Sequence, residues 1–203
     1  EREFFGLNFK VTPATLIPRP DTELLVELAL QKIPQQGRVL DLGTGSGAIA
    51  LSIAHARPDA EVIAVDASPE ALEVAQDNAR RLKLANVRLL HSDWFSALQD
   101  ARFVLIVSNP PYIASADAHL EQGDLRFEPR TALASGSDGL DDIRRIIADA
   151  KAHLLADGWL LFEHGYDQAE RVRELLRQAG YAEVFSAHDL SGIERVSGGR
   201  AAF

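Results

Sequence analysis

The residues of this chain that could do chemistry stand in two places, a glycine-rich stretch and a double proline. The first stretch is DLGTGSGAIA (41–50), with glycines at 43, 45 and 47. The second is SNPPYIAS (108–115), in which an asparagine and two prolines directly follow the apolar run FVLIV (103–107). Proline cannot donate to a sheet ladder, so a strand must end there. Both stretches therefore read as turns at the ends of buried strands.

The glycine-rich turn predicts a bound cofactor. Glycines let the backbone approach a ligand closely at the switch point of an α/β sheet. Asp66 ends the next apolar run, and its carboxylate could accept both ribose hydroxyls of an adenosine cofactor. Gly43 to Ala48 also fits the dinucleotide pattern G-x-G-x-x-A. These residues therefore indicate an adenosine-type cofactor without identifying it, and a tight turn without any ligand is the simpler alternative.

The double-proline turn offers acceptors with few competing donors. Asn109 precedes a proline and is biased to an extended backbone, and its side-chain oxygen is an acceptor. Pro110 and Pro111 have no N–H groups, and Tyr112 adds a flat apolar face. Such a turn suits a planar NH₂ group that donates both hydrogens to protein oxygens. The alternative is a rigid turn with a tyrosine in the core.

A third signal is HSDWF (91–95), which follows another apolar run. Asp93 could accept from an exocyclic adenine amine, and Trp94 could stack on the ring. Alternatively, Asp93 caps a helix and Trp94 belongs to the core. His164, after Glu163, could be catalytic, but a structural role fits it better. No cluster of side chains has metal-ligand spacing.

Short apolar runs alternate with helical patterns along the chain. We expect strands at 38–43, 60–66, 86–91, 103–108, 158–164, 181–187 and 193–198. We expect helices at 22–33, capped by Asp21 or Thr22, and at 46–56, 69–84, 139–155 and 168–179. The near-continuous apolar strands are typical of a parallel sheet covered on both faces. The pattern predicts an open, doubly wound α/β domain in which the strand before the double proline lies beside the strand before the glycines.

The remaining segments divide the chain. Residues 1–20 read as a hairpin and a proline-rich connector, and residues 21–203 as the catalytic domain. The longest irregular stretch, 114–138, follows the double proline, where a long loop is usually functional.

Composition narrows the class of protein. The 203 residues carry a net charge of −9, which disfavours nucleic acid as a partner. The pairs Arg80-Arg81 and Arg144-Arg145 stand on expected helices and read as solvated faces. There is no cysteine, and no apolar run reaches the length of a membrane span. No signal-peptide pattern opens the chain, so we expect a cytoplasmic protein.

Together these motifs resemble a known family. D-x-G-x-G-x-G followed by N-P-P-Y is similar to S-adenosylmethionine-dependent methyltransferases of planar amide or aromatic amine nitrogens. The resemblance narrows with PRPDTE (18–23), SDWFSAL (92–98), RFEPRTAL (126–133) and FEHG (162–165). The whole set resembles the HemK-type protein-(glutamine) N-methyltransferases, which modify the Gly-Gly-Gln glutamine of class-I peptide chain release factors. The implied fold is a Rossmann-like, mostly parallel seven-stranded sheet.

The resemblance also implies roles for residues. The side chain of Asn109 and the carbonyl of Pro110 accept the two amide hydrogens, and Tyr112 packs on the amide plane. Asp66 takes the ribose hydroxyls and Trp94 lies near the adenine. The cofactor-binding residues are then Gly43, Thr44, Gly45, Ser46, Gly47, Asp66, Asp93, Trp94 and Asn109, and the catalytic ones are Asn109, Pro110, Pro111 and Tyr112.

Other positions carry weaker expectations. Phe127, Glu128 and Arg130 shape the substrate side by the same resemblance. Arg19 and Glu23 close over the pocket, or only begin a helix. Family members carry a small helical substrate-docking domain before the catalytic one, and we expect it to be absent from this sequence.

Three rival functions remain open. A nucleic-acid adenine methyltransferase shares the NPPY motif. A nicotinamide-dependent oxidoreductase shares the glycine pattern but leaves the two prolines unexplained. A silent cofactor-binding scaffold is disfavoured by the intact NPPY.

Overall fold

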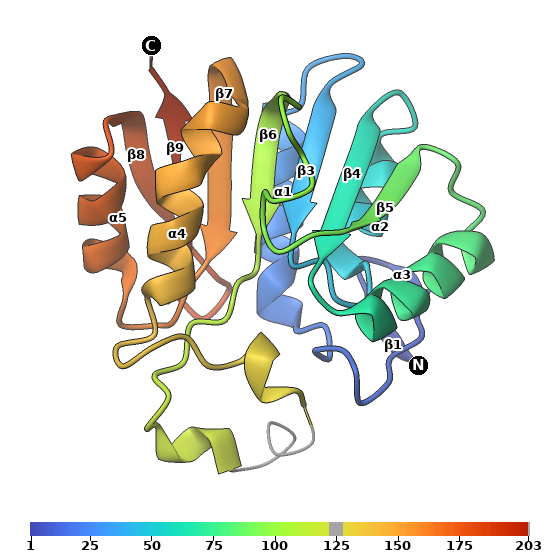
Figure 1. Ribbon diagram of the computed structural model, residues 1–203, viewed down its shortest axis with the longest axis horizontal. Coiled ribbons are helices and arrows are strands. Elements are labelled where there is room, and N and C mark those ends of the chain that lie inside the picture. Colours follow the sequence, from blue (N-terminus) through green and yellow to red (C-terminus); the bar gives the residue numbers. More distant parts are fainter. Residues whose placement is uncertain (122–127, 203) are drawn as a thin grey trace.

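Seven strands form one sheet through the middle of the computed structural model, which describes residues 1–121 and 128–202. They are β3 (Arg38–Leu42), β4 (Glu61–Asp66), β5 (Val87–His91), β6 (Phe103–Ser108), β7 (Leu154–Glu163), β8 (Tyr181–His188) and β9 (Glu194–Ala201). Their order is β5-β4-β3-β6-β7-β9-β8, and neighbours are parallel except in the two pairs that β9 makes (Figure 1). The predicted doubly wound sheet is confirmed, with β3 beside β6.

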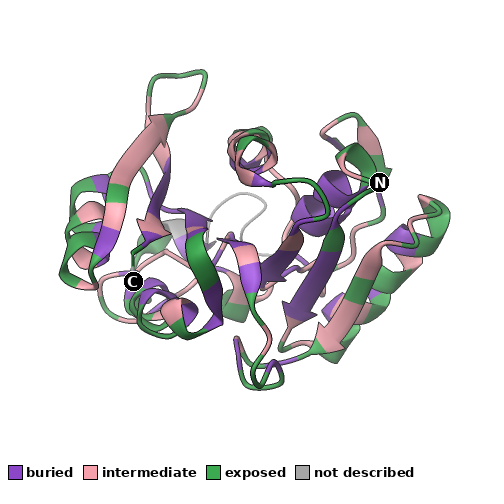
Figure 2. Ribbon diagram, turned by 90° about the horizontal axis from the view of Figure 1, so that it is seen from above, coloured by how far each residue is buried: buried purple, intermediate pink, exposed green. Residues whose placement is uncertain are grey.

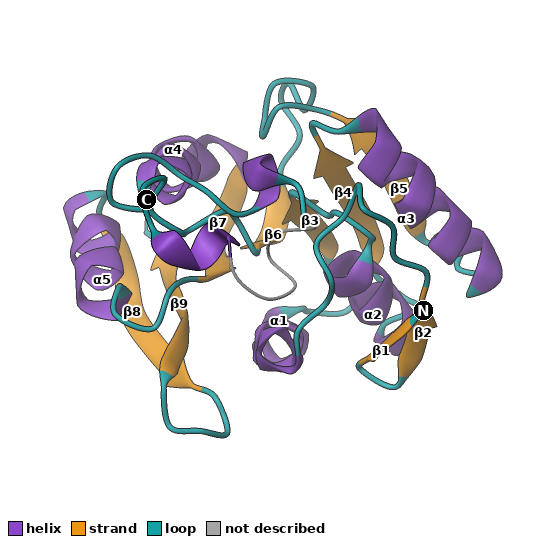
Figure 3. Cartoon of the chain, turned by 90° about the horizontal axis from the view of Figure 1, so that it is seen from below, coloured by secondary structure: helices purple, strands orange, loops and turns teal. Residues whose placement is uncertain are grey.

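Helices cover both faces of the sheet. They are α1 (Glu23–Lys32), α2 (Ala48–Ala56), α3 (Pro69–Arg81), α4 (Asp141–Ala150) and α5 (Ala169–Gln178). Figure 3 shows α1 and α2 on one side of the sheet and α4 and α5 on the other. Successive strand residues supply opposite faces: Val39 joins the core under α1 and α2, and Leu40 joins the core under α4 and α5. The middle strands are therefore buried along their length (Figure 2).

The parallel strands all end at one edge, where the loops gather (Figure 1). The hairpin of β1 (Arg2–Phe4) and β2 (Leu7–Phe9) precedes them, as predicted, and its Phe4 and Phe9 rings meet edge to face at 6.2 Å. Short 3₁₀ turns follow in the connections, namely η1 (Pro20–Thr22), η2 (Ala118–Glu121), η4 (Arg130–Ala132) and η5 (Lys151–His153). None of the helices in the described residues is both long and apolar enough to cross a membrane.

Two helices were predicted too long at their C-terminal ends, and the predicted cap of a third was wrong. The helix expected to reach residue 155 stops at Ala150, because Leu154 already pairs with Phe103 as the start of β7. The helix expected to reach residue 84 stops at Arg81, and Lys83 adopts a positive φ of 57°. The cap predicted for α1 is absent, since the Thr22 side chain makes no capping bond there.

Candidate active site

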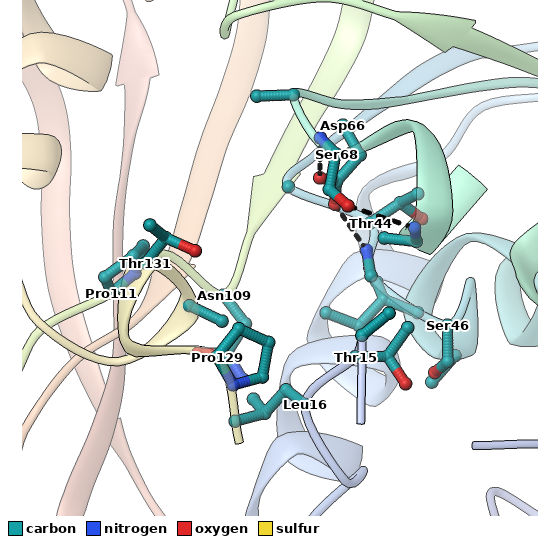
Figure 4. A pocket seen from close by; sticks show the side chains of 18 of the residues that line it. Thr15, Leu16, Thr44, Ser46, Asp66, Ser68, Asn109, Pro111, Pro129 and Thr131 are labelled. Carbon is teal, nitrogen blue, oxygen red and sulfur yellow. Dashed lines mark hydrogen bonds between the residues drawn. The ribbon is translucent and has the colours of Figure 1, made fainter. Parts of the chain in front are cut away.

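A cavity of about 640 Å³ lies at the carboxyl edge of the sheet, within the size range of small-molecule sites. The predicted residues that line it are Gly43, Thr44, Gly45, Ser46, Asp66, Asp93, Trp94, Asn109 and Pro111. Gly47, Pro110 and Tyr112 lie in the same two turns but do not line it. Figure 4 shows Thr44 and Asp66 on one side of the cavity, with Pro111 and Thr131 across from them.

The glycine-rich turn forms one wall because its backbone is left-handed at three places. Gly43, Gly45 and Gly47 have φ values of 70°, 56° and 85°, which favour glycine. The N–H groups of Gly43 and Thr44 both donate to the Val65 carbonyl at 2.9 Å, so the turn is tied to β4. A Cβ added to Gly45 would meet nothing within 4 Å. The turn therefore presents bare backbone to open space, as a cradle for a ligand.

Asp66 organises this wall from the end of β4. Its Oδ2 accepts from the Gly45 N–H at 2.8 Å and its Oδ1 from the Ser68 N–H at 2.9 Å (Figure 4). Ser68 in turn caps α3, since its hydroxyl accepts from the Ala71 N–H at 3.1 Å. Each carboxylate oxygen has a second lone pair. Asp66 can therefore hold the turn and still accept two ligand hydroxyls.

Asp93 and Trp94 also line the cavity. Both Asp93 oxygens accept from the Arg145 guanidinium, at 3.0 and 2.9 Å. Asp93 does not cap a helix, because residues 94–97 form turns. Arg145 is exposed on α4, as predicted for a solvated face, and its side chain also lines the cavity. The Trp94 ring lies beside Gly43, where an added Cβ would come within 3.4 Å of it.

The double-proline turn forms the opposite wall and is tied into the fold from several sides. The Tyr112 carbonyl accepts from Gln168 Nε2 at 2.9 Å. The Ile113 N–H donates to the Leu133 carbonyl at 2.9 Å, which joins the turn to the segment after residue 128. The Asn109 amide nitrogen donates to the Thr22 hydroxyl at 3.3 Å. Hydrogen bonds therefore fix the turn at Asn109, at Tyr112 and at the residue that follows, Ile113.

A buried carboxylate stands behind this wall at the end of β7. Glu163 is 2% exposed and accepts from the Thr22 hydroxyl at 2.6 Å and from the Tyr112 hydroxyl at 2.9 Å. Burial raises the pKa of Glu163, and these two donors oppose the rise. Burial and the Glu163 charge also raise the pKa of the Tyr112 phenol. The phenol therefore acts as a hydrogen-bond donor to the carboxylate.

Asp41, the first residue of the glycine-rich stretch, is fully buried on β3. Its Oδ2 accepts from the Thr44 hydroxyl at 2.6 Å. Burial raises the pKa of Asp41 from 3.8 to about 7, with a smaller contribution from the charge of Asp66. The carboxyl group therefore titrates near neutral pH directly beneath the turn.

His164 has a structural role, because both of its ring nitrogens are hydrogen-bonded within the fold. It is fully buried, its Nδ1 lies 2.9 Å from the Gly165 carbonyl and its Nε2 lies 2.8 Å from the Ser197 hydroxyl. Burial lowers its pKa. Neither ring nitrogen is directed at the cavity, whose lining does not include His164.

An ion pair joins the N-terminal connector to the segment that follows residue 128. Arg19 donates to the buried Glu128 at 2.7 Å, and the Ile17 N–H reaches the same oxygen at 3.4 Å. Glu23 instead accepts from the Phe5 N–H at 2.8 Å and fastens the hairpin. Arg130 begins the exposed turn η4, and Phe127 lies outside the described residues.

Four buried polar residues that hold the walls of the site were not predicted from the sequence, namely Thr22, Asn78, Glu163 and Gln168. Asn78, for example, donates to the Ser46 carbonyl at 2.9 Å and accepts from the Lys10 N–H at 2.8 Å, so it joins the glycine turn to the connector. The available signal was an asparagine on the apolar face of a helix, since a buried polar group needs partners. Among the residues the structure describes, no three His, Cys, Asp or Glu side chains gather as they would around a metal ion.

Comparison with known proteins agrees with the geometry. The methyltransferase small domain family matches residues 20–126. Release factor glutamine methyltransferase of Escherichia coli K12 is 54% identical over 200 residues, which cover 98% of this chain and 72% of that protein. The Bordetella pertussis protein of the same name is 60% identical over 202 residues, covering 98% and 74%.

A solved structure agrees with these relatives. The release factor-specific protein-(glutamine-N5) methyltransferase of Alicyclobacillus acidocaldarius superimposes with a TM-score of 0.57 at 33% identity, covering 96% of this chain and all of that one. Such identities do not favour the nucleic-acid alternative. This chain belongs to the family of release factor glutamine methyltransferases.

Proposed function

We propose that this chain transfers a methyl group from S-adenosylmethionine to the side-chain amide nitrogen of the glutamine in the Gly-Gly-Gln motif of class-I peptide chain release factors. The observation that supports it most is that one cavity is lined by the glycine turn, Asp66, Asn109 and Pro111. Because release factors act in translation, the proposed reaction is a cytoplasmic one. We assign it to residues 21–203, preceded by the hairpin and connector of residues 1–20.

The residues of the cavity fit the cofactor. Gly45 leaves open space beside the backbone, and Asp66 keeps an acceptor site on each oxygen for a ribose diol. Trp94 and Asp93 also line the cavity, so the ring can contact the adenine and the carboxylate can accept from its amine. When bound, S-adenosylmethionine supplies an electrophilic methyl group on a sulfonium centre.

The double-proline turn would prepare the acceptor nitrogen. An amide nitrogen is a poor nucleophile, because its lone pair is delocalised into the carbonyl. In our proposal, Asn109 Oδ1 and the Pro110 carbonyl accept the two amide hydrogens and orient the nitrogen for in-line attack. The contribution is positioning and stabilisation of the charge that develops on nitrogen. The surplus proton leaves to solvent after transfer, so a strong general base is not required.

The test is transfer of a labelled methyl group to a purified release factor. We expect label on the release factor, none on a variant in which alanine replaces the motif glutamine, and none on DNA. Mass spectrometry of the motif peptide should place the added methyl group on the glutamine side chain. Label on DNA but not on the release factor would replace this proposal by the adenine methyltransferase.

A further inference from the structure

Three hydrogen bonds behind the double-proline turn connect its asparagine to its tyrosine. Asn109 Nδ2 lies 3.3 Å from Thr22 Oγ1, Thr22 Oγ1 lies 2.6 Å from Glu163 Oε2, and Glu163 Oε1 lies 2.9 Å from the Tyr112 hydroxyl. We call Thr22 and Glu163 the carboxylate relay. Both are buried, at 4% and 2% exposure, although the relay joins positions 141 residues apart in the sequence.

The direction of these bonds is set by the carboxylate. Glu163 accepts from the Thr22 hydroxyl on one oxygen and from the Tyr112 hydroxyl on the other, so Thr22 gives its single proton to Glu163 and has none left for Asn109. The lone pairs of that hydroxyl then face Asn109, and only the NH₂ end of the Asn109 amide can donate to them. The amide oxygen must therefore lie at the other side of the group, away from Thr22. A neutral partner in place of Glu163 would leave the two ends of the amide interchangeable.

The same carboxylate also fixes the tyrosine. The Tyr112 phenol donates to the second oxygen of Glu163, while Gln168 holds the Tyr112 carbonyl. Thr22 and Glu163 are 4% and 2% exposed, so their polar groups depend on partners within the protein. One buried group thus sets both side chains that flank the two prolines.

We propose that Thr22 and Glu163 are positioning residues that hold the Asn109 amide with its oxygen toward the substrate nitrogen. The inference rests on the proposed function of Asn109 as the acceptor of a glutamine amide hydrogen. Thr22 lines the cavity next to Asn109 and Glu163 does not, and in this proposal both act through Asn109. The distance from Asn109 to Thr22, 3.3 Å, is the longest of the three, so this is the weakest of the three hydrogen bonds.

The expected effects follow from which bond is lost. Thr22→Val keeps the shape but removes the hydroxyl, and we expect kcat to fall about 10-fold, the value of one neutral hydrogen bond. Glu163→Gln lets the Thr22 hydroxyl accept from the new amide and donate instead to the oxygen of a reversed Asn109 amide. We expect kcat to fall about 10- to 100-fold there, because the reacting groups lose their alignment. Thr22→Ser should restore most of the rate, and KM for the cofactor should stay unchanged in all three.

A double-mutant cycle separates positioning from simple packing. In the Asn109→Ala background, Thr22→Val should lower kcat no further, because the group through which it acts is gone. A matched control is Ser197→Ala, which removes a buried hydroxyl bonded to His164 on the neighbouring strand. We expect that variant to lose thermal stability with kcat unchanged. If the losses of kcat from Thr22→Val and Asn109→Ala add up in the double variant, the proposed role of Thr22 and Glu163 is wrong. It is also wrong if Ser197→Ala lowers kcat as much as Thr22→Val does.

A second readout does not depend on methyl transfer. The Asn109 side-chain NH₂ signals can be assigned by proton–nitrogen NMR from their loss in Asn109→Ala. We expect slowed hydrogen exchange of these protons in the wild type and in Thr22→Ser, and fast exchange in Thr22→Val. Exchange equally fast in all would refute the relay, even if the protein proves inactive on release factors. Inactive wild-type enzyme with the expected exchange pattern would refute the proposed function alone.

Discussion

Removing the carboxylate of Asp66 should cost the cofactor more affinity than any other single change to the glycine wall. In the free protein this carboxylate already accepts the N–H groups of Gly45 and Ser68, one on each oxygen. It is therefore preorganised, with a second lone pair of each oxygen available to a ribose diol. Asp66→Ala removes those acceptors and also releases the turn that lines the cavity.

The size of the effect follows from the bonds that the carboxylate can make. A hydrogen bond to a charged acceptor contributes about 1.5–3 kcal/mol. Two such bonds to the ribose hydroxyls amount to about 3–6 kcal/mol, or about 100- to 10,000-fold in the dissociation constant. The loosened turn adds to that loss, so we expect the dissociation constant to rise by more than about 100-fold.

Calorimetric titration with S-adenosylmethionine and with its demethylated product measures this directly. The matched control is Asp59→Ala, since Asp59 also accepts a backbone N–H, from Gln36 at 2.9 Å, but lies before β4 at the opposite edge of the sheet. We expect wild-type affinity in the control. A folded Asp66→Ala protein that binds within threefold of the wild type would refute the assignment of Asp66 to the ribose.

Three further predictions follow from the other carboxylates. Asp93→Ala should weaken cofactor binding only about 3- to 10-fold in the same titration, because this side chain is 60% exposed and shared with Arg145; a loss as large as that of Asp66→Ala would contradict this. The pKa of Asp41 is raised to about 7, so the folded state holds a proton that the unfolded state releases near 3.8, and stability is lost as the pH rises through 7. Between pH 5 and pH 8 that loss is about 3 kcal/mol, and Asp41→Asn should abolish it in urea unfolding at those two pH values, whereas parallel behaviour of the two proteins would argue against it. Tyr112→Phe leaves one oxygen of Glu163 without its phenol donor, and should lower the free energy of unfolding by about 1–3 kcal/mol; an unchanged urea midpoint would show that the bond contributes nothing.

The elements that carry the site could be predicted from the sequence because their signals are local. The apolar run 103–107 can only be a buried strand, and the prolines at 110 and 111 can only end it. The three glycines predict a turn that other residues would strain, and the turn has that backbone. The rule that β3 and β6 adjoin in a doubly wound sheet then brings both turns to one cavity.

What could not be predicted depends on contacts between distant segments. Thr22 has the residue type of a helix cap, yet its hydroxyl makes no cap bond and donates instead to a buried carboxylate on β7. Arg145 has the pattern of a solvated helix face, but Asp93, 52 residues earlier, draws it to the cavity. The end of α4 was missed because Leu154 continues a helical apolar period, while its partner in the sheet lies at Phe103. None of these partners is visible in a local window of sequence.

The central claim is that Asn109 holds the substrate amide, and single-turnover methyl transfer by Asn109→Ala tests it most directly. The enzyme is saturated with labelled S-adenosylmethionine, mixed with a release factor and stopped at short times, with melting curves and cofactor titrations run on the same preparations. We expect a folded protein with wild-type cofactor affinity and a transfer rate lower by about 100- to 1000-fold, the typical cost of deleting one preorganised hydrogen-bonding partner. A folded, cofactor-bound Asn109→Ala enzyme that methylates the glutamine at the wild-type rate would contradict the account.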